Sequence, residues 1–209
     1  KINRIQNSEQ GIAVAKYKHA LQDPCASSKL LLLGMIVGLL GFLIYANTFT
    51  NGYALDDSFA ITKNYLVKQG VRGIPELLCT SYRHGYTASG NSLYRPLPLI
   101  MLAVEWNIAP GKASLGHFVN ALLYAVTGYF LFLMLHKLFS TFHLIVPFLI
   151  SILFIVHPIH TEVVANIKSR DEILAFLLSI LSLLALLKYV SRKSLTWFIF
   201  ALCSYFLAL

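Results

Sequence analysis

Apolar residues in this chain form long blocks that are separated by short polar segments. A helix rises 1.5 Å per residue, so about 20 apolar residues cross the roughly 30 Å of hydrocarbon in a membrane. The blocks cover residues 30–49, 118–138, 139–156, 173–190 and 195–209. This pattern predicts an all-α, polytopic helical membrane protein.

One further apolar segment, residues 96–108, is too short to cross, because it measures only about 20 Å as a helix. It also contains Glu105, which is costly to place in lipid. Pro96 suits the first turn of a helix, and Pro110-Gly111 ends it. We expect an interfacial or re-entrant helix within a long first loop, residues 50–117.

The charges sort the polar segments between the two sides of the membrane. If 96–108 does not cross, the basic segments 1–29, 136–143 and 188–194 share one side, which the positive-inside rule makes the cytoplasm. The other side then holds the first loop and seven of the nine acidic residues, namely Asp56, Asp57, Glu76, Glu105, Glu162, Asp171 and Glu172. The expected organisation is a cytoplasmic segment 1–29, followed by part of a transmembrane domain over 30–209.

Composition narrows the class of protein and its partners. Hydrophobic residues make up 57% of the chain and charged residues only 12%, whereas about a quarter of a soluble domain is charged. The net charge of +8 comes from Lys and Arg in short segments between apolar blocks. That placement indicates a lipid bilayer and not nucleic acid as the partner. Cys25, Cys79 and Cys203 fall in three different compartments, so no disulfide is expected.

Paired acids follow the first span, at Asp56-Asp57. Adjacent carboxylates repel each other, which raises one pKa and suits a general base, or else both bind a cation. The alternative is structural, because Asp57 can cap a helix that starts at Ser58.

Cations suited to a phosphate occur at Tyr94-Arg95-Pro96 and at Lys168-Ser169-Arg170. Arginine holds phosphate through two parallel hydrogen bonds, and lysine adds a mobile donor. The alternatives are an arginine that reaches from a helix start to the membrane surface, and a charged loop with local ion pairs.

Residues His157, His160 and Glu162 form a third polar cluster at the outer end of the third span. Two histidines and a glutamate can ligate a metal or position a substrate, while the alternative is hydrogen-bonded packing. Pro158 should break the helix there. HExxH is absent, which argues against a zincin-type protease.

Three further polar residues fall at the same membrane surface. Glu105 should face protein or an aqueous cavity. His117 and Asn120, near the outer end of the second span, should join this layer, and interhelical hydrogen bonding is the favoured role for both.

Taken in order, these motifs resemble one family over about residues 30–190. The motifs are Asn51-Gly-Tyr-Ala-Leu-Asp-Asp57, Tyr94-Arg-Pro-Leu97, His117-Phe-Val-Asn120 and His157-Pro-Ile-His-Thr-Glu162 with Arg170. The sequence is similar to the transmembrane and tetratricopeptide-repeat O-mannosyltransferases and their bacterial relatives, which are GT-C class glycosyltransferases. It departs from them at Ser169, where Gly is common, at Tyr124, where His is common, and at Ala54-Leu55, where animal members have Val-Phe. These departures favour a bacterial protein in the inner membrane, with its site facing the periplasm and a repeat domain elsewhere.

The resemblance implies transfer of mannose or a similar sugar from a polyprenyl-phosphate carrier to a Ser/Thr hydroxyl of an acceptor protein. Asp56 or Asp57 would be the base. Phosphate would be bound by Arg95, Lys168 and Arg170. The residues that would shape the site or bind substrate are Tyr94, Glu105, His117, Asn120, His157, His160 and Glu162. The resemblance fixes no cofactor, and a divalent metal is left open.

Two other functions are alternatives to an enzymatic function. A transport or channel subunit should carry charges at span centres, but here they gather at the outer ends. A non-catalytic membrane scaffold should tolerate replacement of all the polar clusters.

Overall fold

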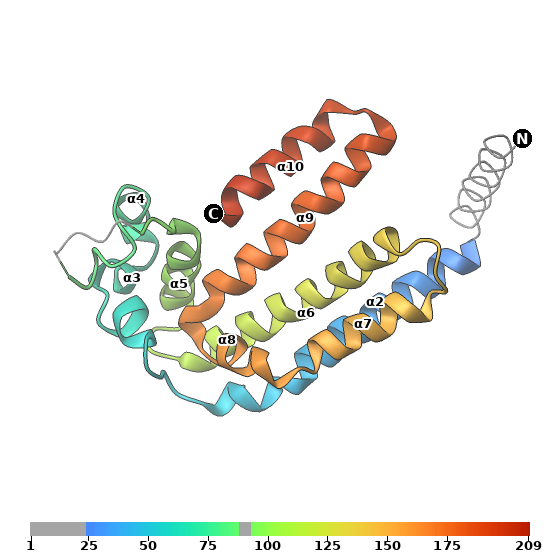
Figure 1. Cartoon of the computed structure of the whole chain (residues 1–209). Coiled ribbons are helices and arrows are strands. Elements are labelled where there is room, and N and C mark those ends of the chain that lie inside the picture. The colour runs from blue at the N-terminus through green and yellow to red at the C-terminus, as the bar shows by residue number, and fades with distance from the viewer. Residues whose placement is uncertain (1–23, 88–92) are drawn as a thin grey trace, which may run out of the picture.

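The computed structural model describes residues 24–87 and 93–209, in which every regular element is a helix (Figure 1). Three helical segments are long and apolar enough to cross a membrane: Ser28–Thr50, Ala113–Leu138 and Ile167–Arg192. A bent pair, Ile145–Ile155 with Pro158–Val164, makes a fourth if it counts as one span. The all-α prediction is confirmed, and the chain has three to four candidate membrane spans.

The long helices follow the predicted blocks closely. Helix α2 (Pro24–Ile44) continues into a 3₁₀ turn, η1 (Ala46–Thr50). The second and fourth blocks lie in α6 (Ala113–Leu138) and α9 (Arg170–Arg192), which both begin before the apolar run does. Helix α10 (Leu195–Ala208) runs back along α9 (Figure 1).

The predicted start of the third span differs from the structure. Residues 139–143 form the turn between α6 and α7 (Ile145–Ile155), in which the Phe142 amide donates to the Phe139 carbonyl at 3.0 Å. Ser140, Thr141 and His143 are polar and exposed there, so this stretch is better solvated as a turn than buried in a helix.

The predicted break at Pro158 is confirmed. Helix α7 ends at Ile155, and His157 has an extended backbone, with φ −68° and ψ 126°. A 3₁₀ turn, η4 (Pro158–His160), and α8 (Thr161–Val164) follow, with a bend of 48° after α7. Proline removes a helical hydrogen bond and clashes with the preceding turn, which accounts for the bend.

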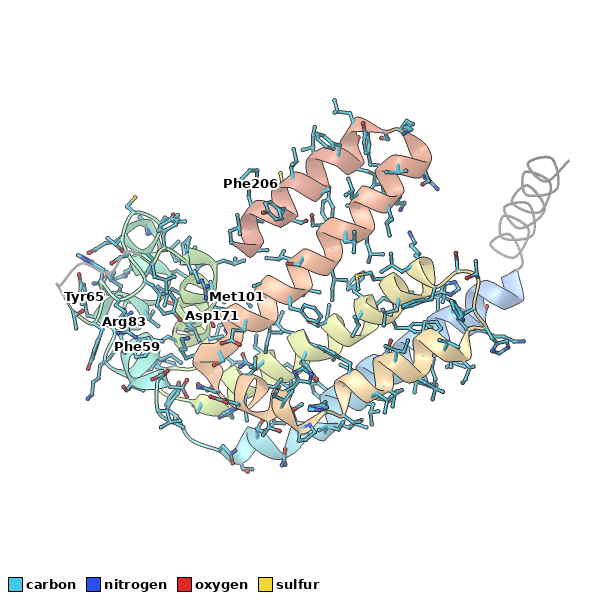
Figure 2. The ribbon with its side chains drawn as sticks, in the orientation of Figure 1. Phe59, Tyr65, Arg83, Met101, Asp171 and Phe206 are labelled. Carbon is cyan, nitrogen blue, oxygen red and sulfur yellow. The ribbon has the colours of Figure 1, made fainter. Side chains whose placement is uncertain are left out.

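The first loop folds into a compact unit of short helices at one end of the bundle (Figure 1). Its elements are η2 (Ser58–Thr62), α3 (Tyr65–Lys68), η3 (Gly70–Gly73), α4 (Ile74–Leu77) and α5 (Pro96–Ile108). Helix α5 has the predicted bounds and packs mainly on α3, η3 and α4. Figure 2 labels Phe59, Tyr65 and Arg83 within this unit, and Asp171 where α9 meets it.

Small residues let the bundle helices approach closely. A Cβ at Gly38 of α2 would lie 3.0 Å from the Ala125 carbonyl oxygen of α6, and one at Gly128 would lie 2.7 Å from Ile155 of α7. Such contacts hold helices together in a membrane, where apolar surface alone gives no driving force.

The opposite end of the bundle carries the basic turns. Lys137, in the last turn of α6, lies within range of the charges of Lys188 and Arg192 on α9, and the Lys188 amine lies 3.8 Å from the Trp197 ring centroid. These turns therefore lie at the same end, as the predicted topology requires. The basic residues predicted within 1–23 fall outside the described residues. Cys79 and Cys203 are free thiols.

Candidate functional site

The two acids of the first loop have different surroundings. Asp57 is 1% exposed, and its carboxylate accepts hydrogen bonds from the Ala54 amide at 2.9 Å and the Lys168 amide at 2.8 Å. Asp57 makes no side-chain cap to the following helical turn, so the predicted cap is not formed. Asp56 is exposed to solvent. Asp57 thus ties the first loop to the segment before α9, while Asp56 stays in contact with solvent.

Burial raises the pKa of the Asp57 carboxyl above its ordinary value of 3.8. The two backbone amides, His117 and Arg170 act in the opposite direction but do not outweigh burial. A group whose pKa is raised by folding favours the folded state at low pH, and this contribution is lost as the pH rises through the raised pKa.

Arg170 is the centre of a buried polar network. It is 0% exposed, and its Nη1 and Nη2 donate to the two carboxylate oxygens of Glu105, the second at 3.1 Å. Its Nε donates to Asn120 Oδ1 at 2.8 Å, and Nη2 also donates to the Gly116 carbonyl at 3.1 Å. Arg170 therefore joins α5, α6 and α9 and leaves no nitrogen exposed for a phosphate.

Two other cations remain partly accessible around Asp171. Arg95 Nη1 lies 2.9 Å, and Lys168 Nζ 3.5 Å, from the same oxygen, Asp171 Oδ2. The Asp171 side chain is 2% exposed, whereas those of Arg95 and Lys168 are 38% and 19% exposed. One carboxylate thus holds two cations whose side chains are still partly exposed.

The polar layer predicted from the second span is present. Asn120 Nδ2 donates to the Asn166 carbonyl at 3.0 Å, so Asn120 joins α6 to the segment before α9 as well as to Arg170. The buried His117 Nε2 lies 3.3 Å from the Gly52 carbonyl, and its Nδ1 has no hydrogen-bond partner in the described part of the chain. Tyr94 is exposed, and its hydroxyl donates to the Leu78 carbonyl at 2.7 Å.

The His–Glu cluster forms a separate group. His157 Nδ1 accepts from the Ile159 amide at 3.2 Å, and the His160 ring packs 4.4 Å from Phe154 and 5.8 Å from Tyr124, centroid to centroid. Glu162 is exposed in the first turn of α8. Within residues 24–87 and 93–209, no three His, Cys, Asp or Glu side chains come together to hold a metal.

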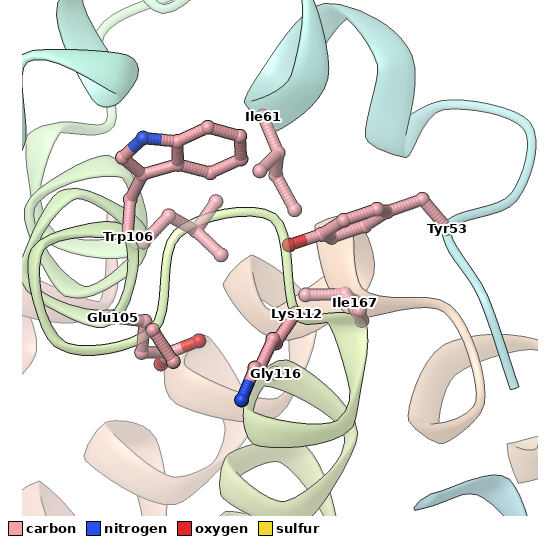
Figure 3. Close-up of a pocket in the computed structure, with 9 residues that line it drawn as sticks. Tyr53, Ile61, Glu105, Trp106, Lys112, Gly116 and Ile167 are labelled. Carbon is pink, nitrogen blue, oxygen red and sulfur yellow. The ribbon is translucent and has the colours of Figure 1, made fainter. Parts of the chain in front are cut away.

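Sequence reasoning missed several residues that line a recess between α5 and the start of α6 (Figure 3). The recess is shallow and partly open to solvent, with room for about one water molecule. Tyr53, Trp106 and Lys112 line it together with Glu105. Their proximity in sequence to predicted site residues could have identified two of them, because Tyr53 lies shortly before Asp56 and Trp106 directly follows Glu105.

Comparison with known proteins identifies relatives. Protein O-mannosyl-transferase TMTC2 of Homo sapiens is 32% identical over 176 residues, which cover 76% of this chain and 19% of that protein. For tmtc2 of Xenopus laevis the identity is 32% over 187 residues, 83% of this chain and 21% of that protein. The chain is a distant relative of the TMTC protein O-mannosyl-transferases. The resemblance inferred from the motifs is confirmed.

The match covers only part of these relatives. The chain spans about a fifth of their length. Protein O-mannosyl-transferase F38B6.6 of Caenorhabditis elegans is 29% identical over 76% of this chain, and the match covers 23% of that protein. No family model and no solved structure matches the chain. These three relatives are animal proteins, so the bacterial origin stays a prediction.

Proposed function

We propose that this chain is part of a GT-C-type glycosyltransferase of the membrane. It would move mannose or a similar sugar from a polyprenyl-phosphate carrier to a Ser/Thr hydroxyl of a protein at the extracytoplasmic face. The relation to the O-mannosyl-transferases supports the reaction class. The observation that carries the proposal is that Asp57, next to the exposed Asp56, binds the backbone amide of Lys168, whose side chain shares Asp171 with Arg95.

Asp56 is the proposed general base. Asp57 has both carboxylate oxygens occupied by backbone amides and is buried, whereas Asp56 is exposed beside it. The Asp56 carboxylate takes the proton of the acceptor hydroxyl as that oxygen attacks the anomeric carbon. A bond forms between the acceptor oxygen and the anomeric carbon, and the bond from that carbon to the phosphate oxygen breaks. One displacement inverts the anomeric carbon.

Arg95 and Lys168 are the proposed partners of the departing phosphate. A polyprenyl phosphate needs little protonation as it leaves, but it needs positive charge close by. Asp171 holds both cations in place before the donor arrives. Arg170, with its nitrogens already bonded to Glu105, Asn120 and Gly116, positions the helices that carry them.

The remaining predicted residues shape the site in this proposal. His117 holds the Gly52 carbonyl near the start of the loop, and Asn120 fixes the segment before α9. His157 and His160 pack within the bend after α7, and the exposed Tyr94 and Glu162 are the remaining candidates for contact with substrate. In a bacterial protein, the end of the bundle that carries the first-loop unit would face the periplasm.

Separate substitution of the two first-loop acids tests the base. In membranes that carry the full-length protein, Asp56→Asn should lower the transfer rate by about 10²–10⁴-fold with normal protein levels, the usual contribution of a general base. Asp57→Asn should instead lower thermal stability, because the amide keeps only one oxygen for two backbone donors.

The transfer rates of the wild type and the variants distinguish an enzyme from a non-catalytic scaffold. Full transfer by Asp56→Asn would rule out this base. Absence of transfer by the wild type with every lipid-linked sugar tried would favour the non-catalytic scaffold.

A further inference from the structure

The end of the bundle away from the first-loop unit brings together cations from two helices (Figure 1). Lys137 is in the last turn of α6, Arg192 is in the last turn of α9, and Lys188 lies one turn before it. The charges of Lys188 and Arg192 both act on the Lys137 amine. Lys193 follows directly at the end of α9. These four residues, the basic cluster, therefore join the ends of α6 and α9 in one region of positive charge.

No acidic side chain accompanies the basic cluster within residues 24–87 and 93–209. The acids in this part of the chain lie in the first-loop unit, in α8 or in the first turn of α9, and its ion pairs lie there too. Like charges within range of one another repel, which destabilises the folded state. An anion bound at the cluster would remove this repulsion.

Structural roles account for only part of the cluster. Cations at the C-terminal ends of helices are stabilised by the helix dipole, and Lys188 Nζ lies 3.8 Å from the Trp197 ring centroid. Glycine is the usual residue at the left-handed end of a helix, yet Lys193 stands there with a φ of 53°. Lys137, Arg192 and Lys193 are exposed, so their side chains can meet an anion.

Apolar side chains next to the cluster are exposed as well. Leu186 and Val190 lie one turn apart on α9, and Leu138 is the last residue of α6. Tyr189 and Trp197 belong to the same turns, and such aromatic residues are enriched at the level of lipid headgroups. A phospholipid matches this surface, because its phosphate meets the cations and its acyl chains cover the apolar residues.

The net charge of the lipid decides how well it fits. A zwitterionic headgroup brings its own cation to the phosphate, whereas an anionic headgroup leaves a negative charge for the cluster. About four to eight Lys and Arg residues at the cytoplasmic end of membrane helices are typical of binding to anionic lipid, and each strengthens it about fivefold. The cluster has four such residues, on the side that the positive-inside rule assigns to the cytoplasm.

We propose that the basic cluster is a binding site for the headgroup of an anionic phospholipid of the cytoplasmic leaflet. The phosphate accepts hydrogen bonds from cations of both α6 and α9, and the acyl chains lie along the exposed apolar residues of the same helices. The bound lipid thereby joins the two helix ends. The site is separate from the proposed sugar transfer at the opposite end, so its test needs no turnover.

Photo-crosslinking tests the site in the intact protein. The full-length protein is reconstituted in vesicles of phosphatidylcholine and phosphatidylglycerol, with a trace of one or the other lipid carrying a diazirine on an acyl chain. We expect the phosphatidylglycerol probe to label residues 134–142 and 186–199 in preference to the phosphatidylcholine probe. Higher salt should reduce this preference, because it screens exposed charges. Equal labelling by the two probes at low salt would overturn the site.

Variants of the cluster separate its charge from its shape. Lys137→Gln/Lys188→Gln/Arg192→Gln should lower the preference for the anionic probe by about tenfold or more, because three cations are lost. Lys137→Arg/Lys188→Arg/Arg192→Lys keeps the three charges and should keep the preference.

Three exposed cations of the first-loop unit supply the matched control. Lys63→Gln/Lys68→Gln/Arg72→Gln removes the same net charge at the opposite end and should leave labelling at the cluster unchanged. An unchanged preference in the neutralised cluster, or an equal loss in this control, would overturn the site. If the neutralised cluster fails to fold, the charge-retaining variant and the salt dependence of the wild type decide, because a purely structural role predicts no preference for lipid charge.

Discussion

Arg170 and Glu105 show how a buried ion pair can serve structure at the edge of a membrane. Arg170 is fully buried and the Glu105 side chain is 13% exposed, so both charges are largely removed from water. Burial raises the pKa of Glu105, and Arg170 opposes that rise. Each charge is tolerable only because the other is present, together with Asn120 and the Gly116 carbonyl.

Removal of one charged partner should therefore destabilise the folded protein far more than removal of both. Arg170→Met leaves Glu105 buried without its partner and should lower the free energy of unfolding by about 3–5 kcal/mol, whereas Arg170→Met/Glu105→Leu should recover much of that loss. Thermal or denaturant unfolding in detergent measures the stability of the single and the double variant of the full-length protein. Exposed Glu172→Gln is the control. A single variant as stable as the wild type would contradict the network described here.

The residue scale also shows what the sequence could predict about the site. Polar residues at Asp56, Arg95, Lys168 and Arg170 were predicted to share one side of the membrane, and the structure pairs Arg95 and Lys168 with Asp171, next to the buried Arg170. Which of these residues would be buried and which accessible was not predictable. Whether an arginine is accessible depends on which carboxylate lies beside it, and Glu105 is 65 positions away in the chain.

At the scale of elements, the first loop is ordered by local hydrogen bonds and close approaches. Asn64 begins α3, and its Oδ1 accepts from the Leu66 and Val67 amides, both at 3.1 Å. The Gly85 carbonyl accepts from the Tyr65 amide at 2.8 Å and so brings a later segment against this cap. A Cβ at Gly85 would lie 1.9 Å from Asn64 Oδ1, so only glycine fits there.

Gly85→Ala should therefore unfold this part of the loop locally. The added methyl displaces the Asn64 side chain, and loss of such a cap costs about 1 kcal/mol before any wider rearrangement. Limited proteolysis of the full-length protein should show faster cleavage between residues 50 and 95. Gly52→Ala is the matched control, because nothing lies within 4 Å of a Cβ there. Equal cleavage of Gly85→Ala and wild type would show that the cap does not order the loop.

The bounds of a helix were predictable where they follow from the length and apolarity of the segment. Helix α5 has the predicted bounds because prolines mark its start and its end. The turn at 139–143 was missed because its phenylalanines read as apolar, while solvation of Ser140, Thr141 and His143 decided the structure. The four-residue helices α3 and α4 are too short for a periodic pattern. Helix α3 depends on its Asn64 cap, and both depend on packing against α5.

At the scale of the whole molecule, the described acids gather at one end of the bundle, where cations accompany them, while the turns at the opposite end carry cations. The described acids lie in the first-loop unit, in α8 or in the first turn of α9, while Lys137, Lys188, Arg192 and Lys193 lie at the opposite turns (Figure 1). A reaction that takes a lipid-linked sugar at the outer surface would use the first end. A cytoplasmic nucleotide sugar would have to meet the second.

The choice of donor tests this account most directly. The purified full-length protein is reconstituted with an acceptor peptide rich in Ser and Thr, and given labelled mannose either on a polyprenyl phosphate or on a nucleotide. The account predicts a hexose on a peptide hydroxyl from the polyprenyl-phosphate donor alone, and loss of that product in Asp56→Asn. Transfer from the nucleotide sugar in the absence of any lipid-linked sugar would contradict it.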